Sequence, residues 1–379
     1  KTGNTTAGEF AMLPNIAGPI NITAGNTTIT NGLTSTGASS SVTISAAGTA
    51  LVNGAIQAAG PVKITSTGTA TLNKNLTSTG SSSGILVKSQ GSIATGAGTN
   101  TTTGATTFTT AGGPITFWAG SDGSGTIDIA NLNKFDSNSA GTTGGGDITF
   151  GGNATAASGN ADKPAGPVVT ATGNAVELGS SLTQNNGVQI AADGGALYIG
   201  GKTASTSASG VEYFPGLTVS AGTVEIYGET ATATTVNNTA AGVFAAAYNT
   251  RDNTVSGTIT ATDSFSVPTD AITITGKSGS DYSLMLGNQS ATNLVTTQAL
   301  AGIKIYGDST DTSSNGPFIA NVSIKTTSGN ITIDSANDTA IIGTSSSTNV
   351  RGVVLGDSGT SGSITISGGG PDLYSVAIS

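Results

Sequence analysis

The sequence predicts an all-β protein folded as a right-handed parallel β-helix (β-solenoid) with about 20 or more residues per coil. Three observations lead to this fold class. Short blocks repeat along the chain, each block carries the alternating apolar pattern of a strand, and small residues dominate the composition. Glycine supplies 57 of the 379 residues and charged side chains only 9%. That composition does not fit a helical bundle or a coiled coil.

The clearest repeat comprises two consecutive blocks, residues 41–60 and 61–80, which align without a gap. They read SVTISAAGTALVNGAIQAAG and PVKITSTGTATLNKNLTSTG. The block before them, residues 19–37, fits after one residue is dropped. Near-identical blocks at a fixed period favour coils that stack on one another over a closed sandwich, whose strands pair in varied registers.

Each block contains an apolar-x-apolar step followed by a turn with glycine. Val42 and Ile44 form this step in one block, and Val62 and Ile64 form it in the next. A period of two places these side chains on one face of a short strand. We therefore expect two or three strands per block, pairing in parallel with neighbouring coils and stacking aliphatic side chains inward.

The same step recurs along the rest of the chain at wider and less even spacing. We predict regular solenoid coils over residues 1–165, and a continuing solenoid with longer, less regular coils and surface loops over residues 166–379. The further copies are GPITFWAG at 113–120, GDITFGG at 146–152, GPVVTATG at 166–173, TVEIYG at 223–228, AITITG at 271–276, GIKIYG at 302–307, GNITID at 329–334 and GSITIS at 362–367.

Three stretches interrupt this pattern. Residues 151–166 and 200–210 are polar or rich in small residues, and their composition predicts loops. Residues 240–248, AAGVFAAAY, form the one apolar clump. A segment of this length is compatible with a strand, which we favour, or with a helix.

Cysteine and histidine are both missing, which excludes disulfides, thiolate nucleophiles and imidazole bases. The net charge of −9 and the lack of a basic cluster argue against nucleic acid as a partner. No apolar run reaches the roughly 18 residues of a membrane-spanning helix, so we expect none. Because a large exported protein can rely on its fold alone for stability, we favour a secreted or cell-surface location.

Acid/base chemistry in a β-helix requires carboxylates that cluster on one face of successive coils. We interpret the nearest such cluster as ordinary turn aspartates and expect no enzyme, no catalytic residue and no cofactor. That cluster consists of Asp308, Asp311, Asp334 and Asp338, with Lys304 and Lys325 nearby.

Residues 122–128, DGSGTID, resemble the middle of a calcium loop because oxygen ligands alternate around a glycine. The ends of that loop do not fit, since Gly120 and Asn131 stand where carboxylates belong. We therefore interpret the segment as a turn between strands and predict no metal site.

Two kinds of surface site remain as candidates. Seven aromatic residues could stack on sugars, although most are expected to cap coil ends or core edges: Trp118, Tyr198, Tyr213, Phe214, Tyr227, Tyr282 and Tyr306. Candidate glycosylation sequons occur at Asn4, Asn21, Asn26, Asn75, Asn100, Asn153, Asn237, Asn288, Asn321, Asn330 and Asn337, a number that chance also gives in a chain this rich in Asn, Ser and Thr.

With these repeats in view, the chain resembles the passenger regions of secreted adhesins of the filamentous haemagglutinin and high-molecular-weight adhesin type, which use two-partner secretion. The resemblance rests on GNITI at 329–333, GSITIS at 362–367, the STG turns after Ile64 and Leu76, and the absence of cysteine. It implies export through an outer-membrane partner and display at the cell surface. One departure is that the Asn-Pro-Asn motif of the family's secretion domain is incomplete here, since residues 13–15 read Leu-Pro-Asn.

The sequence therefore predicts a non-enzymatic extracellular structural protein, either an adhesin stalk or passenger or a subunit of an extracellular fibre. Expected partners are further copies that associate end to end into filaments, and a glycan or protein on a host or neighbouring cell. The alternative is a carbohydrate-active or tailspike-like β-helix that binds or cleaves polysaccharide.

Overall fold

A computed structural model describes residues 16–96, 105–139, 141, 144–179, 187–214, 216–231, 241–245, 258–261, 271–279, 282–286, 295–299, 301–309, 316–319, 322–336, 340–342, 354–356, 362–368 and 376–378. These residues form strands and turns, and no helix long and apolar enough to cross a membrane occurs among them. The chain divides into two compact units. Unit 1 comprises residues 1–169 and 189–198, and unit 2 comprises residues 170–188 and 199–379.

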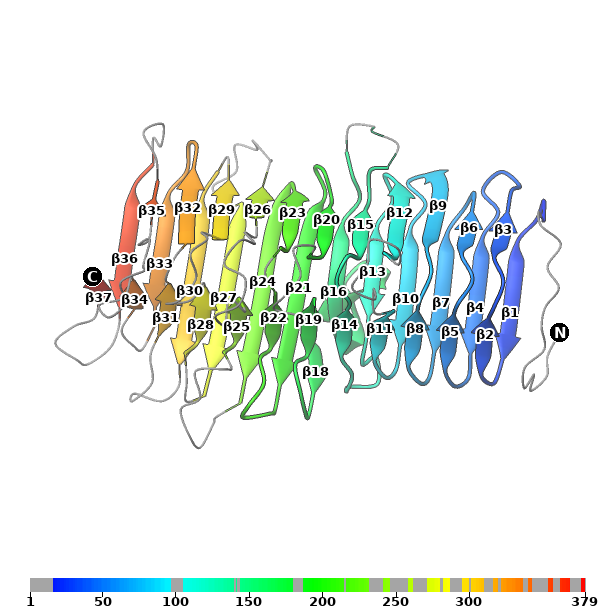
Figure 1. The fold of residues 1–379 in the computed structure, drawn as a ribbon, viewed down its shortest axis with the longest axis horizontal. Helices are drawn as coiled ribbons and strands as arrows, with labels where there is room; N and C mark the ends of the chain where they lie inside the picture. The colour runs from blue at the N-terminus through cyan, green and yellow to red at the C-terminus, as the bar shows by residue number, and fades with distance from the viewer. Residues whose placement is uncertain are drawn as a thin grey trace. The chain divides into compact units, whose positions relative to one another are not determined.

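Unit 1 is built from three parallel sheets, to which successive strands of the chain contribute in turn (Figure 1). The first sheet contains β1 (Ile20–Ala24), β4 (Val42–Ala46), β7 (Val62–Ser66), β10 (Ile85–Ser89), β13 (Ile115–Trp118) and β16 (Ile148–Ala157). The second contains β2 (Thr27–Ile29), β5 (Ala50–Val52), β8 (Ala70–Leu72), β11 (Ile93–Thr95) and β14 (Ile127–Ile129). The third contains β3 (Leu33–Ser35), β6 (Ile56–Ala58), β9 (Leu76–Ser81), β12 (Thr107–Ala111), β15 (Lys134–Asp136) and β20 (Gln189–Ala191).

Unit 2 repeats this plan (Figure 1). Its first sheet contains β24 (Thr223–Thr230), β27 (Ile272–Ser278), β30 (Ile303–Ser309), β33 (Ile331–Ser335) and β36 (Ile364–Gly368). Its second contains β19 (Val176–Leu178), β22 (Val211–Tyr213), β25 (Val243–Ala245), β28 (Leu284–Leu286), β31 (Pro317–Ile319), β34 (Ala340–Ile342) and β37 (Val376–Ile378). Its third contains β23 (Thr218–Ala221), β26 (Thr258–Ala261), β29 (Val295–Ala299), β32 (Val322–Thr326) and β35 (Val354–Leu355). Two of the boundaries between the units fall inside strands, one in β18 (Val168–Thr170) and one in β21 (Ala196–Thr203).

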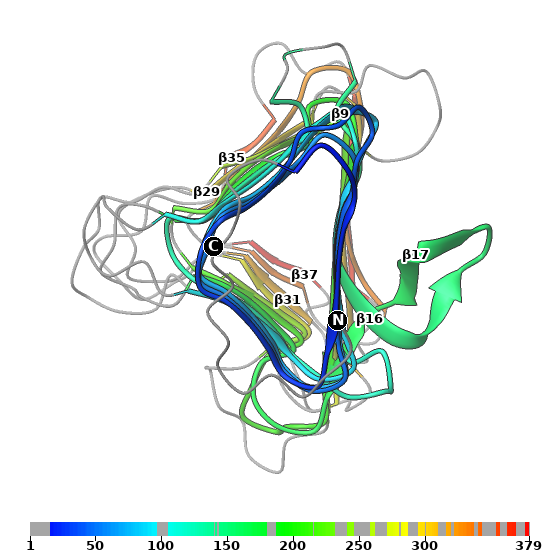
Figure 2. The ribbon, with the colours of Figure 1, turned by 90° about the vertical axis from the view of Figure 1, so that its right-hand side faces the viewer.

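The repeat read from the sequence is also the pairing register. Val42 pairs with Val62 and Ile44 with Ile64, as the alignment of the two blocks predicts. The blue and cyan coils of unit 1 trace a three-sided outline when viewed end on (Figure 2). The prediction of an all-β, β-helix-like architecture with parallel sheets is therefore confirmed.

The inner face of each unit is a set of aliphatic ladders. In the first sheet of unit 1, Val42, Val62 and Ile115 are fully buried. Within β4 and β7, every second residue is buried and the residues that alternate with them point outward. In unit 2, Ile272 and Ile303 occupy the equivalent inward positions of β27 and β30. Burying one such side chain stabilises the fold by roughly 1.5–3 kcal/mol. Because similar apolar residues stack in register, each coil offers the next one a matching apolar surface to cover.

Unit 1 adds aromatic rings to this interior. Phe108 of β12 stacks on Phe135 of β15 with 4.7 Å between ring centroids. Phe117 and Phe150 enter from the first sheet and meet Phe135 edge to face, at 5.4 and 4.9 Å. All four rings are fully buried. We call Phe108, Phe117, Phe135 and Phe150 the inner aromatic cluster.

The structure corrects one loop prediction and part of the other. Residues 151–166 form most of an antiparallel hairpin between β16 and β17 (Asn160–Gly166), which projects from the coils in Figure 2. Ser158 and Gly159 form the two-residue turn between the strands, and glycine accommodates the φ of 78° at the second position. The loop predicted at 200–210 is confirmed for residues 204–210, which lie outside strands, but residues 200–203 belong to β21. Polar composition misled the prediction for residues 151–166 because the strands of the hairpin are largely exposed.

The apolar clump at 240–248 contains β25, a strand as favoured above, and its remaining positions outside residues 241–245 lie beyond the described ranges.

Candidate functional site

Of the predicted carboxylate cluster, the structure describes Asp308 and Asp334, which are not register partners of each other and lie in strands rather than in turns. Asp308 of β30 stacks on Lys277 of β27. Asp334 of β33 stacks on Tyr306 and accepts a hydrogen bond from the Ser367 hydroxyl at 2.6 Å. Lys325 lies on β32, in the third sheet, where it pairs with Gln298, whereas Lys304 lies on the first sheet. Asp311 and Asp338 lie outside the described residues.

The calcium-like segment forms a turn between β13 and β14. The Gly123 N–H donates to the Gly120 carbonyl at 2.8 Å, and the Asp122 carboxylate accepts from the Ser124 N–H at 3.4 Å. Within the described ranges, no three residues of the acidic, histidine or cysteine type gather to hold a metal ion. Asp122 thus serves the turn itself.

The aromatic residues proposed as sugar platforms separate into two groups. Trp118 is only 1% exposed and Tyr213 is buried, so neither ring is accessible for stacking on a sugar. Tyr227 and Tyr306 lie half-buried on the outer face of the first sheet of unit 2. Trp118 points outward from β13, but the β16–β17 hairpin closes over it.

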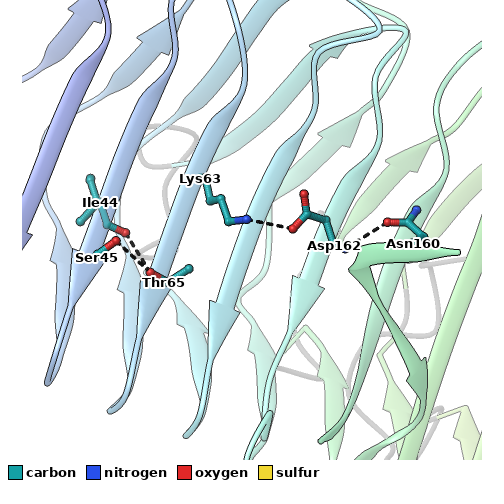
Figure 3. Close-up of polar contacts among 6 residues, drawn as sticks. All are labelled: Ile44, Ser45, Lys63, Thr65, Asn160 and Asp162. Carbon is teal, nitrogen blue, oxygen red and sulfur yellow. Dashed lines mark hydrogen bonds and ion pairs between the residues drawn. The ribbon is translucent and has the colours of Figure 1, made fainter. Parts of the chain in front are cut away.

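The hairpin is attached to the first sheet of unit 1 by polar contacts. The Trp118 indole N–H donates to the Asn153 carbonyl at 2.8 Å, and the Lys88 ammonium lies 3.6 Å from the centroid of the Trp118 ring. The Lys63 ammonium donates to the Asp162 carboxylate at 2.9 Å (Figure 3). In the same view, the Thr65 hydroxyl lies 3.3 Å from the Ser45 hydroxyl of the neighbouring strand. Burial, aided by the nearby Lys63 charge, lowers the pKa of Lys88.

Several sequon asparagines have a role in the fold. The side-chain carbonyls of Asn26, Asn75 and Asn330 each accept a backbone N–H from the next coil, at 2.9 Å, from Thr49, Thr107 and Ser363. Asn21 and Asn153 are exposed. Glycosylation stays a prediction for these sites, and the remaining sequons lie outside the described residues: Asn4, Asn100, Asn237, Asn288, Asn321 and Asn337.

Sequence reasoning missed a carboxylate pair in unit 2. Glu177 of β19 and Glu212 of β22 are register partners on adjacent strands of the second sheet. The Asn174 amide donates to the Glu177 carboxylate at 2.9 Å and also to the Glu212 carboxylate. The signal was present in the sequence as VEL at 176–178 and VEY at 211–213, in which glutamate occupies the same strand position.

The Glu212 carboxyl differs from that of an ordinary surface glutamate. Its pKa is raised to about 7, first by burial and then by the charge of Glu177, and the Asn174 hydrogen bond opposes both effects. Next to Glu212 in register is Phe244 of β25. Phe244 belongs to a buried group with Ala241, Met285 and Phe318, against which Phe214 and Tyr282 pack. We call this group the outer aromatic cluster.

Chemically, this arrangement places a carboxyl that retains its proton near neutral pH beside a second carboxyl, at the margin of an apolar surface. Such pairs can donate and accept protons. Comparison of the chain with family models, with curated proteins and with solved structures finds no match.

Proposed function

We propose that the protein is a non-enzymatic, secreted or cell-surface structural protein, an adhesin stalk or passenger or a subunit of an extracellular fibre. The supporting observation is the in-register stacking of short parallel strands in each unit, with an inner face of aliphatic ladders. A fold in which each coil contacts only its neighbours lengthens by adding coils, and length is what a stalk or fibre needs.

The proposal includes a right-handed parallel β-helix with about 20 or more residues per coil. The register supports this coil length, because Val42 pairs with Val62, 20 positions later, and Ile303 with Ile331, 28 positions later. Right-handed crossovers are the general rule for parallel strands in one sheet.

The resemblance to filamentous haemagglutinin-type adhesins enters the proposal through two neighbouring strands. GNITI and GSITIS, the segments that carry the resemblance, supply β33 and β36, where Ile331 pairs with Ile364 and Ile333 with Ile366. The motif is therefore a coil-to-coil repeat with a structural purpose. Export and surface display would follow from membership of that family, and a glycan or protein on another cell would then be the partner.

End-to-end association into filaments is part of the proposal, and Ile364 is the position at which it can be tested. Ile364 continues the inward ladder above Ile331, and it is 46% exposed while Ile331 is fully buried. A further coil would cover it, whether that coil comes from more of the same chain or from another copy in a filament. The unpaired edge of a parallel sheet is a ready template for such an addition.

Negative-stain electron microscopy with sedimentation tests the proposal. We expect elongated particles or filaments, and compact round particles would overturn it. Ile364→Lys places a charge in the inward row and is expected to abolish any filaments while leaving single particles. Thr365→Lys, on the outward row of the same strand, is the matched control and should leave assembly unchanged. Filaments that persist in Ile364→Lys would rule out this end as the contact.

The Glu177–Glu212 pair favours a second candidate, a carbohydrate-active β-helix. A protonated and an ionised carboxyl on adjacent coils suit the cleavage of a glycosidic bond. Release of reducing ends from acidic and neutral bacterial polysaccharides is the appropriate assay. Activity that is lost in both Glu177→Gln and Glu212→Gln but retained in Glu225→Gln, an exposed glutamate of β24, would establish this function in place of the structural one.

A further inference from the structure

We propose that the contact between β19 and β22 in unit 2 is a proton-operated switch, in which Glu212 must hold a proton for the two strands to stay closely paired. When Glu212 ionises, it faces the carboxylate of Glu177 directly across the pair, and the contact loosens. The device is independent of the function proposed above and requires no ligand.

The register makes the two side chains neighbours. Val176 pairs with Val211, Glu177 with Glu212 and Leu178 with Tyr213. Adjacent strands lie about 4.8 Å apart, so outward side chains at paired positions are stacked on one another. Like charges directly opposite each other on neighbouring strands are destabilising.

Asn174 connects the pair to the backbone of the next coil. Its amide nitrogen donates to both carboxylates, and its carbonyl accepts from the Ser209 N–H at 2.8 Å. The Ser209 hydroxyl in turn accepts from the Ala241 N–H at 3.3 Å. A change at Glu212 is therefore transmitted to three successive coils, and Ala241 belongs to the outer aromatic cluster.

No cation among the described residues offsets the charge of Glu212. The facing residue on β19 is Glu177, and the facing residue on β25 is Phe244. Strand β24, which also packs against β22, carries Glu225 and Glu229 on the first sheet, where Glu229 pairs with Lys202. Stacking of opposite charges does occur in unit 2, since Lys277 pairs in register with both Glu229 and Asp308. The like-charged stack of Glu177 and Glu212 contrasts with this opposite-charge stack among the described residues of unit 2.

The direction of the pH response follows from the pKa of Glu212, which is raised from 4.5 to about 7 in the folded chain. Because the folded form holds a proton that the opened form releases, closure is favoured below pH 4.5 and weakens as the pH rises through 7. With these two values, the equilibrium constant for opening rises about tenfold between pH 6 and pH 8.

Hydrogen–deuterium exchange by mass spectrometry at pH 6 and pH 8 tests the switch, after correction for the intrinsic exchange rate. Peptides covering residues 174–178 and 209–214 are expected to open about tenfold more at pH 8 in the unaltered protein. Glu212→Gln keeps the shape of the side chain without the charge, and should show no such increase. Glu225→Gln is the matched control and should behave as the unaltered protein.

A flat profile in the unaltered protein, or the same tenfold change in Glu212→Gln, would overturn the proposal. If Glu212→Gln fails to fold, Glu177→Gln replaces it. That variant removes the like charge but not the burial, so the transition should move to lower pH and persist. A transition that does not move in Glu177→Gln would equally contradict the switch.

Discussion

Among the described residues, the two units place their buried phenylalanine side chains on opposite sides of the same kind of sheet. Unit 1 holds Phe108, Phe117, Phe135 and Phe150 inside the coils, whereas unit 2 has an aliphatic interior in its first sheet and carries Phe244 and Phe318 on the outer face of its second sheet. The sheets need only in-register apolar residues on the inner face, whatever their size. The outer face is therefore free to acquire a second layer of structure, a hairpin in unit 1 and an apolar cluster in unit 2.

The largest expected effect comes from the inner aromatic cluster. Phe135→Ala removes a ring that touches Phe108, Phe117 and Phe150, and should destabilise unit 1 by about 3–5 kcal/mol. Urea unfolding with local exchange measurements checks this value.

Phe244→Ala is the matched substitution in unit 2. Because its ring packs on the outside of a sheet whose inner ladder remains intact, we expect a smaller loss, about 1–3 kcal/mol. An equal or larger loss for Phe244→Ala would erase the contrast between an inner and an outer cluster.

Close coil packing should produce the next effect. A Cβ added at Gly60 would lie 2.3 Å from the Ser39 carbonyl oxygen of the previous coil, so Gly60→Ala is expected to cost about 1–3 kcal/mol. Gly18 has open space around it, and Gly18→Ala is its control. Thermal unfolding curves that coincide for the two variants would refute the close approach of these coils.

A side-chain ladder in unit 1 should contribute less. The Asn73 amide donates to the Asn53 carbonyl of the neighbouring coil at 2.7 Å, and Asn73→Ala should therefore destabilise unit 1 by about 1 kcal/mol. Substituting the exposed Lys74 beside it by alanine should change the urea midpoint little. A similar shift for both variants would argue against an ordered asparagine ladder.

The smallest effect on stability is expected from the exposed ion pair of the hairpin. Asp162→Ala breaks the contact with Lys63 and should cost less than about 1 kcal/mol. Since Trp118 is the one tryptophan, its fluorescence reports whether the hairpin still covers it. A red-shifted emission with only this small loss of stability is the expected result, and an unchanged spectrum would show that the other hairpin contacts suffice.

The sequence predicts the coil repeat because its signal is local and periodic. Val42, Ile44, Val62 and Ile64 alternate with polar residues within each strand, and the block length gives their pairing register. The hairpin escaped prediction because Asn153 to Gly166 has the polar composition of a loop. Within this segment, the Ser158–Gly159 dipeptide, which is typical of a turn, is the one sequence signal for paired strands.

The candidate site was harder to predict because it depends on coils of unequal length. Glu177 and Glu212 are stacked although the chain between them is longer than one regular block. The interpretation of Asp308 and Asp334 as turn aspartates is wrong, because both lie within strands, where each pairs with a residue of another type. Burial, which raises the pKa of Glu212, cannot be read from the sequence at all.

The central claim, that successive blocks stack in register, is tested most directly by disulfide trapping in this cysteine-free chain. Ser45 pairs with Thr65 in unit 1 and Thr332 with Thr365 in unit 2, all on outward rows, so each pair of cysteines should form a disulfide on mild oxidation. Ser45 with Gln57, on the outer faces of two different sheets, is the control and should stay reduced. The predicted result is rapid disulfide formation in both register pairs and none in the control pair. Free thiols in the register pairs, or equal trapping of the control, would contradict the stacked-coil fold.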